Sequence, residues 1–175
     1  WQSVIETVTK KADEDPKYER HLFILSAFYL LGLRISEMAD TEIHQPVMGD
    51  FAPDKNSLWW FNTVGKGNKL REIAVPDAML NALKRYRLSR GLTPLPLRAE
   101  QTPIVYSMKQ SSGLKVRQIR QLVQECFDLA VLTLEKKGLH DAAADLQSAT
   151  VHWLRHTAIS ADVQHRPADH VRLDA

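Results

Sequence analysis

Two short apolar segments separated by a glycine-containing turn constrain the fold of this chain more than any other feature. Residues 58–64 read Leu-Trp-Trp-Phe-Asn-Thr-Val, and residues 70–75 read Leu-Arg-Glu-Ile-Ala-Val. Both are rich in the aromatic and β-branched residues that strands favour. Gly-Lys-Gly-Asn-Lys lies between them at residues 65–69. Together they predict an antiparallel β-hairpin with lysines at its tip.

Most of the remaining sequence has the apolar spacing of helices. Helices are predicted over residues 17–31, briefly from 34, from 77 to 86 or beyond, over 116–134 and from about 150 to 164. The acidic stretch 12–16, which ends in proline, is expected to begin the first helix, and residues 138–149 form a connector with some helical potential. Residues 44–56 and 91–102 are predicted loops, and 104–106 a short third strand. The expected fold is one domain, residues 1–175, mainly α with a small antiparallel β-sheet.

The composition is that of an ordinary globular domain. Hydrophobic residues make up 44% of the 175 residues and charged residues 25%. The longest apolar run, residues 22–33, contains Ser26, Tyr29 and Gly32, so it predicts a buried helix and no membrane partner. The single cysteine, Cys126, allows no internal disulfide and is expected to pack in the core.

Positive charge is concentrated in the middle third of the chain. Residues 65–120 carry 12 Lys and Arg against 3 Asp and Glu, whereas residues 1–64 carry 6 against 10 and residues 121–175 carry 5 against 8. A polyanionic partner requires such asymmetry, because phosphates neutralised by Lys and Arg release counterions. On charge alone, a solvated basic face explains the pattern equally well.

Arg34 follows an apolar helix in the sequence Gly-Leu-Arg-Ile-Ser-Glu at residues 32–37. An arginine this close to a predicted core is costly unless it is paired or meets an anion. The pattern therefore predicts either an internal Arg34–Glu37 salt bridge or an anion site. Lys66 and Lys69 on the hairpin turn can likewise reach a phosphate, or simply keep the turn soluble.

His152 and Arg155 are three residues apart on a predicted helix and therefore share one face. Both lie in its first turns, where unpaired N–H groups favour a phosphate. A half-buried histidine beside an incidental surface arginine is the structural alternative. His152 and His156 are four apart, but no third ligand of the usual kind follows nearby, so no metal site is predicted.

Taken in order, the segments GLRISE, GKGNKLREIAVP and HWLRHT resemble those of the tyrosine recombinase (phage integrase) family. The family pattern has an arginine in Gly-Leu/Met-Arg-x-x-Glu, a lysine in a Gly-Lys-Gly-x-Lys-x-Arg hairpin, and a His-x-Leu-Arg-His segment. The resemblance covers about residues 18–175 and implies the family's catalytic-domain fold. It also implies double-stranded DNA as the partner and a DNA recombination and integration activity that uses no metal and no nucleotide cofactor.

The resemblance implies catalytic roles for four residues. Arg34 and Arg155 correspond to the arginines that clamp the scissile phosphate and stabilise its charge in the transition state. Lys66, with Lys69 as the alternative, corresponds to the general acid that protonates the leaving 5′-hydroxyl. His152 corresponds to the histidine that assists proton transfer.

Other residues receive supporting roles from the same resemblance. Glu37 corresponds to an acid that orients the site, and His156 to a residue that supports the helix and core. The residues expected to contact DNA are Lys69, Arg71, Lys115 and Arg117.

The family's nucleophilic tyrosine follows the His-x-Leu-Arg-His segment at a distance that falls past Ala175, and all 4 tyrosines of this chain precede that segment. The resemblance therefore implies a catalytic domain that is cut before its nucleophile, lacks the N-terminal DNA-clamping domain and is inactive by itself. The full-length protein is expected to be tetrameric on DNA, to serve a mobile element and to lie in the bacterial cytoplasm with the nucleoid. The 175-residue chain is expected to be monomeric.

Three other functions remain open from the sequence. A non-catalytic DNA-binding regulator of the same fold would keep the basic middle third without the chemistry. A type IB topoisomerase would share the phosphate chemistry. A purely structural helical domain would have no nucleic-acid partner.

Overall fold

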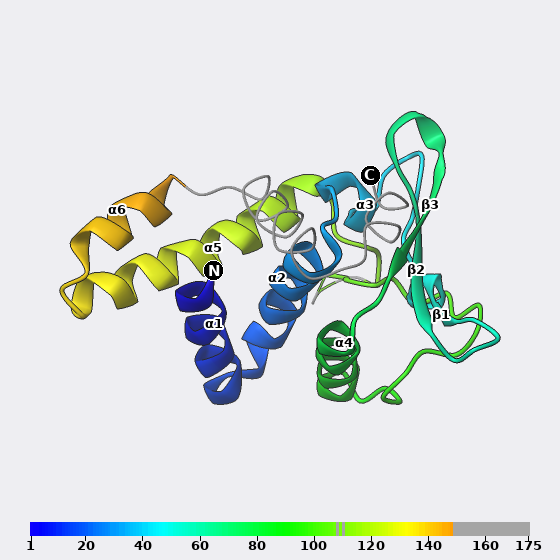
Figure 1. Cartoon of the computed structure of the whole chain (residues 1–175), viewed down its shortest axis with the longest axis horizontal. Coiled ribbons are helices and arrows are strands. Elements are labelled where there is room, and N and C mark those ends of the chain that lie inside the picture. Colours follow the sequence, from blue (N-terminus) through cyan, green and yellow to red (C-terminus); the bar gives the residue numbers. More distant parts are fainter. Residues whose placement is uncertain (108, 110, 149–175) are drawn as a thin grey trace.

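The computed structural model describes residues 1–107, 109 and 111–148. In chain order they form α1 (Gln2–Glu14), α2 (Glu19–Leu31), α3 (Ile35–Met38), β1 (Phe51–Pro53), β2 (Trp59–Val64), β3 (Leu70–Ala74), α4 (Asp77–Ser89), α5 (Val116–Lys136) and α6 (His140–Gln147). Three short 3₁₀ turns cover Pro16–Tyr18, Met48–Asp50 and Lys66–Asn68. The sheet lies at one end of the molecule and α6 at the other, with α3 beside the sheet (Figure 1). The predicted fold class, mainly α with a small antiparallel sheet, is confirmed.

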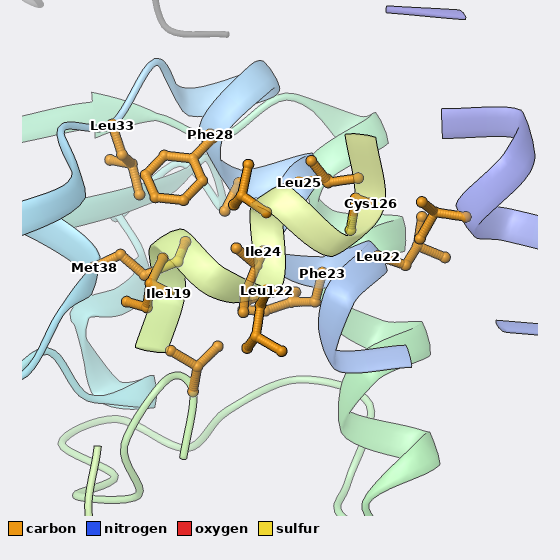
Figure 2. Close-up of a cluster of buried hydrophobic side chains, with 14 of the residues drawn as sticks. Leu22, Phe23, Ile24, Leu25, Phe28, Leu33, Met38, Ile119, Leu122 and Cys126 are labelled. Atoms are coloured by element: carbon orange, nitrogen blue, oxygen red, sulfur yellow. The ribbon is translucent and has the colours of Figure 1, made fainter. Parts of the chain in front are cut away.

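Helix α2 is the centre of the hydrophobic core. Every residue from His21 to Phe28 is buried, because α1, α4 and α5 all pack against this helix. Figure 2 shows side chains of α5, including Ile119 and Cys126, in the same cluster as those of α2. Leu33 and Met38 belong to this cluster as well, so the core fixes the short segment that leads from α2 into α3.

The predicted helices that fall within the described residues are confirmed, and one unpredicted helix, α1, precedes them. Of the stretch 12–16, residues 12–14 end α1, and the Asp15 carboxylate accepts the N–H of Lys17 at 3.0 Å to start the 3₁₀ turn that begins at Pro16. Helix α1 buries residues at positions 4, 8 and 12, the i, i+4 spacing of a helix face. The connector 138–149 contains α6, and the predicted helix at 150–164 lies outside the described residues.

The sheet has the order β1-β2-β3, and both strand pairs are antiparallel. The predicted hairpin is β2–β3, with Phe61 opposite Ile73 and Thr63 opposite Arg71. The prediction that 44–56 is all loop was wrong at β1, where Phe51 pairs with Phe61. The predicted strand at 104–106 was wrong too, since this region makes only isolated bridges, at Pro103 and Tyr106. Proline has no N–H to extend a ladder.

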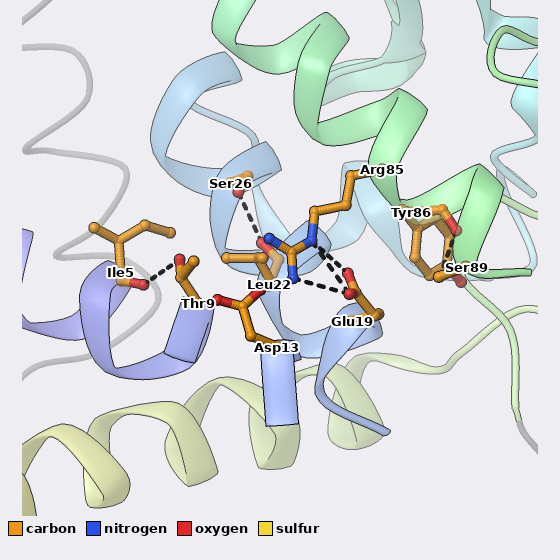
Figure 3. A network of polar contacts seen from close by, with 9 residues as sticks. All are labelled: Ile5, Thr9, Asp13, Glu19, Leu22, Ser26, Arg85, Tyr86 and Ser89. Carbon is orange, nitrogen blue, oxygen red and sulfur yellow. Dashed lines mark hydrogen bonds and ion pairs between the residues drawn. The ribbon is translucent and has the colours of Figure 1, made fainter. Parts of the chain in front are cut away.

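Arg85 on α4 joins three helices through a network of ion pairs (Figure 3). Its Nε and Nη2 each donate to the carboxylate of Glu19 at 2.9 Å, and Nη2 also donates to Asp13 at 2.8 Å. The hydrogen bonds that Arg85 donates to Glu19 and Asp13 raise its pKa above the ordinary value, against the opposing effect of burial. The network therefore holds α1, α2 and α4 in register around the core.

Cys126 is fully buried in α5, as predicted, and burial raises the pKa of its thiol. None of the helices in the described part of the chain has both the length and the apolar character needed to cross a bilayer.

Candidate functional site

Arg34 occupies the position immediately before α3, where the chain turns sharply out of the core. Gly32 ends α2 in the left-handed conformation, with φ 61°, and Leu33 is 1% exposed. The N–H of Arg34 donates to the Glu37 carboxylate at 3.2 Å. The backbone of Arg34 is thus fixed, while its side chain remains 37% exposed at the surface.

The Glu37 side chain is fully buried, and its carboxylate forms ion pairs with two arginines. Nη1 of Arg71 lies 2.8 and 2.9 Å from the two carboxylate oxygens, and Nη1 of Arg34 lies 3.5 Å from one of them. Arg71 reaches Glu37 because it lies opposite the buried Thr63 in the hairpin, on the inward face of the sheet. The Arg71 side chain is only 12% exposed. The predicted Arg34–Glu37 contact exists, but Arg71 is the closer partner.

The hairpin tip lies directly beside Arg34. A Cβ placed on Gly65 would be 3.7 Å from Nη1 of Arg34 and 3.8 Å from Cδ of Arg71, so the glycine backbone passes close to both arginines. The N–H of Gly65 donates to the carbonyl of Lys69 at 2.8 Å and closes the turn. Lys66 and Lys69 are both exposed on this turn.

A cleft of about 360 Å³ separates the hairpin tip from α3 and the turn that follows it. Its lining residues are Arg34, Ser36, Thr41, Ile43 and His44 on one side, and Val64, Gly65, Lys66, Gly67 and Asn68 on the other. Two cations face the cleft, and no carboxylate is among the described residues that line it. Such a surface attracts anions, because the one nearby carboxylate, that of Glu37, is buried and shared between Arg34 and Arg71, so it offsets only part of the positive charge.

The side of the cleft formed by Ser36, Thr41, Ile43 and His44 was not predicted. None of these four residues was a candidate site residue, and residues 44–56 were predicted only as a loop. Asp50 lies close to this side. Burial raises the pKa of its carboxyl, and the N–H of Val47 and the charge of His44 oppose that rise. No periodicity distinguishes these residues in the sequence, so only their position after the Arg34–Glu37 segment points to them.

The N-terminal end of α5 presents a second polar and basic surface. Lys115, Arg117 and Arg120 are exposed there. Nζ of Lys115 lies 3.2 Å from the carboxylate of Asp40, and the N–H of Asp40 donates to the carbonyl of Leu114 at 2.8 Å. These contacts join the start of α5 to the end of α3, two residues after Met38.

The other predicted site residues, His152, Arg155 and His156, lie outside the described residues. The four tyrosines are all described, and none lines the cleft. Tyr29 stacks on Trp1 at 3.8 Å, Tyr86 is 1% exposed in the core, and the Arg90 guanidinium lies 3.9 Å over the ring of Tyr106. No group of three or more His, Cys, Asp or Glu side chains in the described part of the chain is arranged to hold a metal ion.

Neither a protein-family model nor a curated protein sequence matches the chain. Solved structures do match it, and two of them are complexes of one recombinase with DNA. XerH site-specific recombinase bound to its difH substrate in a pre-cleavage complex has a TM-score of 0.62, with 17% sequence identity over 99% of this chain. The post-cleavage complex of XerH with a palindromic difH substrate has a TM-score of 0.61, also with 17% identity over 99% of this chain.

The chain has the fold of these site-specific recombinases. It spans 44% and 43% of the lengths of the two XerH chains. At 17% identity the similarity is one of backbone fold. The chemistry of the cleft depends on the residues of this chain.

Proposed function

We propose that this chain is a DNA-binding domain of a tyrosine recombinase, which cuts and rejoins DNA at a phosphate held in the cleft. One observation carries the proposal: Arg34 and Lys66, which lie 32 positions apart in the sequence, face one cleft that no described carboxylate lines. The recombinase fold and the order of the three sequence motifs support it.

In the proposed reaction, a tyrosine oxygen attacks the DNA phosphorus and forms a 3′-phosphotyrosine. The bond to the 5′-oxygen breaks, and Lys66 supplies the proton that turns this oxygen into a free 5′-hydroxyl, with Lys69 as the alternative donor. A 5′-hydroxyl of a second strand then attacks the phosphotyrosine and releases the tyrosine. Arg34 stabilises the negative charge that builds on the non-bridging oxygens. By resemblance, Arg155 and His152 complete this arrangement.

Glu37 and Arg71 have a positioning role in this proposal. Their buried ion pair, with oxygens 2.8 and 2.9 Å from Nη1, attaches β3 to α3 and so sets the distance between Arg34 and the hairpin tip. Lys115 and Arg117 are proposed to contact the backbone of the DNA outside the cleft, since phosphate contacts fix the position of a protein on a duplex.

Fluorescence anisotropy with a labelled 30-base-pair duplex tests the proposal. We expect binding that weakens steeply with salt, and Arg34→Ala should reduce the slope of log affinity against log salt by about 1. Arg98→Ala removes the same charge from an exposed position in the 91–102 loop and serves as the matched control. Binding that is absent, or that both variants weaken equally, would contradict the proposal.

A second function, DNA binding without strand cleavage by this chain, is favoured by the tyrosine positions, because none of the four lines the cleft. Incubation with nicked suicide duplexes followed by denaturing electrophoresis distinguishes the two functions. We expect no covalent adduct through Tyr18, Tyr29, Tyr86 or Tyr106. An adduct that mass spectrometry maps to one of them would contradict the assignment of this cleft.

A further inference from the structure

His44 forms part of the cleft wall that faces the hairpin tip, on the turn after α3. Hydrogen bonds within the turn hold its backbone in place. The N–H of Thr41 donates to the carbonyl of His44 at 2.9 Å, and the N–H of His44 donates to Oγ1 of Thr41 at 3.2 Å. The turn therefore holds His44 at the wall of the cleft on a fixed backbone.

The Nε2 atom of this imidazole is buried, and no group in the described part of the chain hydrogen-bonds it. Buried ring nitrogens in proteins almost always have a partner, since an unpaired polar atom loses its contact with water and gains nothing in return. Arg34 and Lys66 line the same cleft as cationic donors, yet neither donates to Nε2. As an N–H donor, Nε2 would complement a ligand that supplies oxygen acceptors.

We propose that His44 is a further phosphate-binding residue of this cleft, and that its Nε2–H donates to an oxygen of the phosphate that Arg34 and Lys66 contact. The inference rests on the proposed function for the source of the phosphate, a DNA backbone. It goes beyond that function because His44 lies in none of the three motifs that carry the family resemblance. The ligand supplies the acceptor that Nε2 lacks, after a small rotation of the ring toward the cleft.

Nuclear magnetic resonance of the ¹⁵N-histidine-labelled 175-residue chain tests the inference, with inorganic phosphate as the probe. Phosphate replaces chloride at constant ionic strength, and His44→Gln identifies the ring signals of His44. The Nε2 resonance of His44 should shift and saturate with phosphate, and Arg34→Ala should abolish the shift.

Affinity for phosphate provides the second measurement. His44→Leu should weaken it about tenfold, which is the loss expected for one hydrogen bond to a charged group. His44→Gln places an amide N–H close to the position of Nε2 and should stay within about threefold of the unsubstituted chain. Leu58→Ala truncates an exposed apolar side chain that does not line the cleft, so it is the matched control and should leave the affinity for phosphate unchanged.

The outcomes separate this inference from the proposed function. Two outcomes contradict this inference alone, provided that the duplex binds with the expected salt dependence. Either the Nε2 resonance of His44 does not shift with phosphate, or His44→Leu binds phosphate with unchanged affinity. If the ring responds to phosphate but no duplex binds, the anion site stands and the proposed DNA function fails.

Discussion

Nη1 of Arg71 lies 2.8 and 2.9 Å from the two carboxylate oxygens of Glu37, whose side chain is completely buried. The two residues come from β3 and from α3. Because Arg34 shares the same carboxylate at 3.5 Å, the pair fixes the geometry of the cleft as well as the packing of the sheet. A buried ion pair of this kind is costly to break from one side only.

The first prediction concerns this pair. Glu37→Ala leaves the mostly buried guanidinium of Arg71 without its carboxylate and should lower the free energy of unfolding by about 3–5 kcal/mol. Urea unfolding followed by circular dichroism measures the change. Glu42→Ala, at an exposed position, should stay within about 0.5 kcal/mol. The double variant Glu37→Ala with Arg71→Ala should lose less than the sum of the single changes, and strict additivity would show that the two side chains do not interact.

The orientation of the Arg71 side chain could be predicted from the sequence, but its role could not. Side chains alternate along a strand, so Arg71, Ile73 and Val75 share the face that turns toward the core. This alternation alone predicts that the Arg71 side chain points toward the core, where it can meet the carboxylate of Glu37. The family resemblance predicts Arg71 as a DNA contact. Its side chain is only 12% exposed, which supports the positioning role proposed above.

The elements that sequence reasoning missed were set by tertiary contacts. Strand β1 has three residues, one of them proline, and lies among turn-forming residues. It exists because Phe51 packs against Phe61, with ring centroids 4.6 Å apart, and pairs with β2. Helix α5 was predictable because its buried residues recur at helical spacing, and α2 because its apolar run is as long as a buried helix. No local sequence pattern marks the side of the cleft that contains His44. That side becomes part of a cleft only because the hairpin, from Val64 onward, folds against it.

The second prediction concerns Asp40, which pairs with Lys115 at 3.2 Å at the start of α5. Lys115 is 62% exposed, so the ion pair adds little to stability. Asp40→Asn removes a negative charge beside the proposed DNA surface and releases Lys115 for a phosphate. Duplex affinity at low salt should rise about twofold to fivefold, with a steeper dependence on salt.

Asp141→Asn makes the same charge change on α6 and should leave the duplex affinity unchanged. Weaker binding by Asp40→Asn would mean that the ion pair positions α5 for DNA.

The third prediction concerns the buried hydroxyl of Tyr86. The side chain is 1% exposed and stacks on Phe23 with ring centroids 4.5 Å apart, but its hydroxyl has no hydrogen-bond partner in the described part of the chain. Burial raises the pKa of Tyr86 to about 12. Tyr86→Phe keeps the stacking and removes the unpaired oxygen, so it should raise the free energy of unfolding by about 1 kcal/mol. Tyr18→Phe, at a half-buried position, is the control; a loss of stability in Tyr86→Phe alone would reveal a partner for the hydroxyl.

The last prediction follows from the pairing of Glu100 with Arg87. Nη1 and Nη2 of Arg87 donate to the Glu100 carboxylate at 2.6 and 2.9 Å, and the Arg87 side chain is 1% exposed. These hydrogen bonds join the 91–102 loop to α4. They also lower the pKa of Glu100 from its ordinary value of 4.5, against the opposing effect of burial.

Because the pKa of Glu100 is lower in the folded chain, ionisation of this carboxyl stabilises the fold at any pH well above 4.5. That contribution is lost as the pH falls through the depressed folded pKa, where the folded chain also takes up the proton. Glu100→Gln should therefore lower the free energy of unfolding by about 2 kcal/mol at neutral pH, and the difference should shrink as the pH falls below 4.5. Urea midpoints measured across this range give the profile. Glu135→Gln, at an exposed position on α5, is the control, and its free energy of unfolding should differ from that of the unsubstituted chain by the same small amount at every pH. If the loss for Glu100→Gln also stays constant with pH, packing and not charge holds the loop.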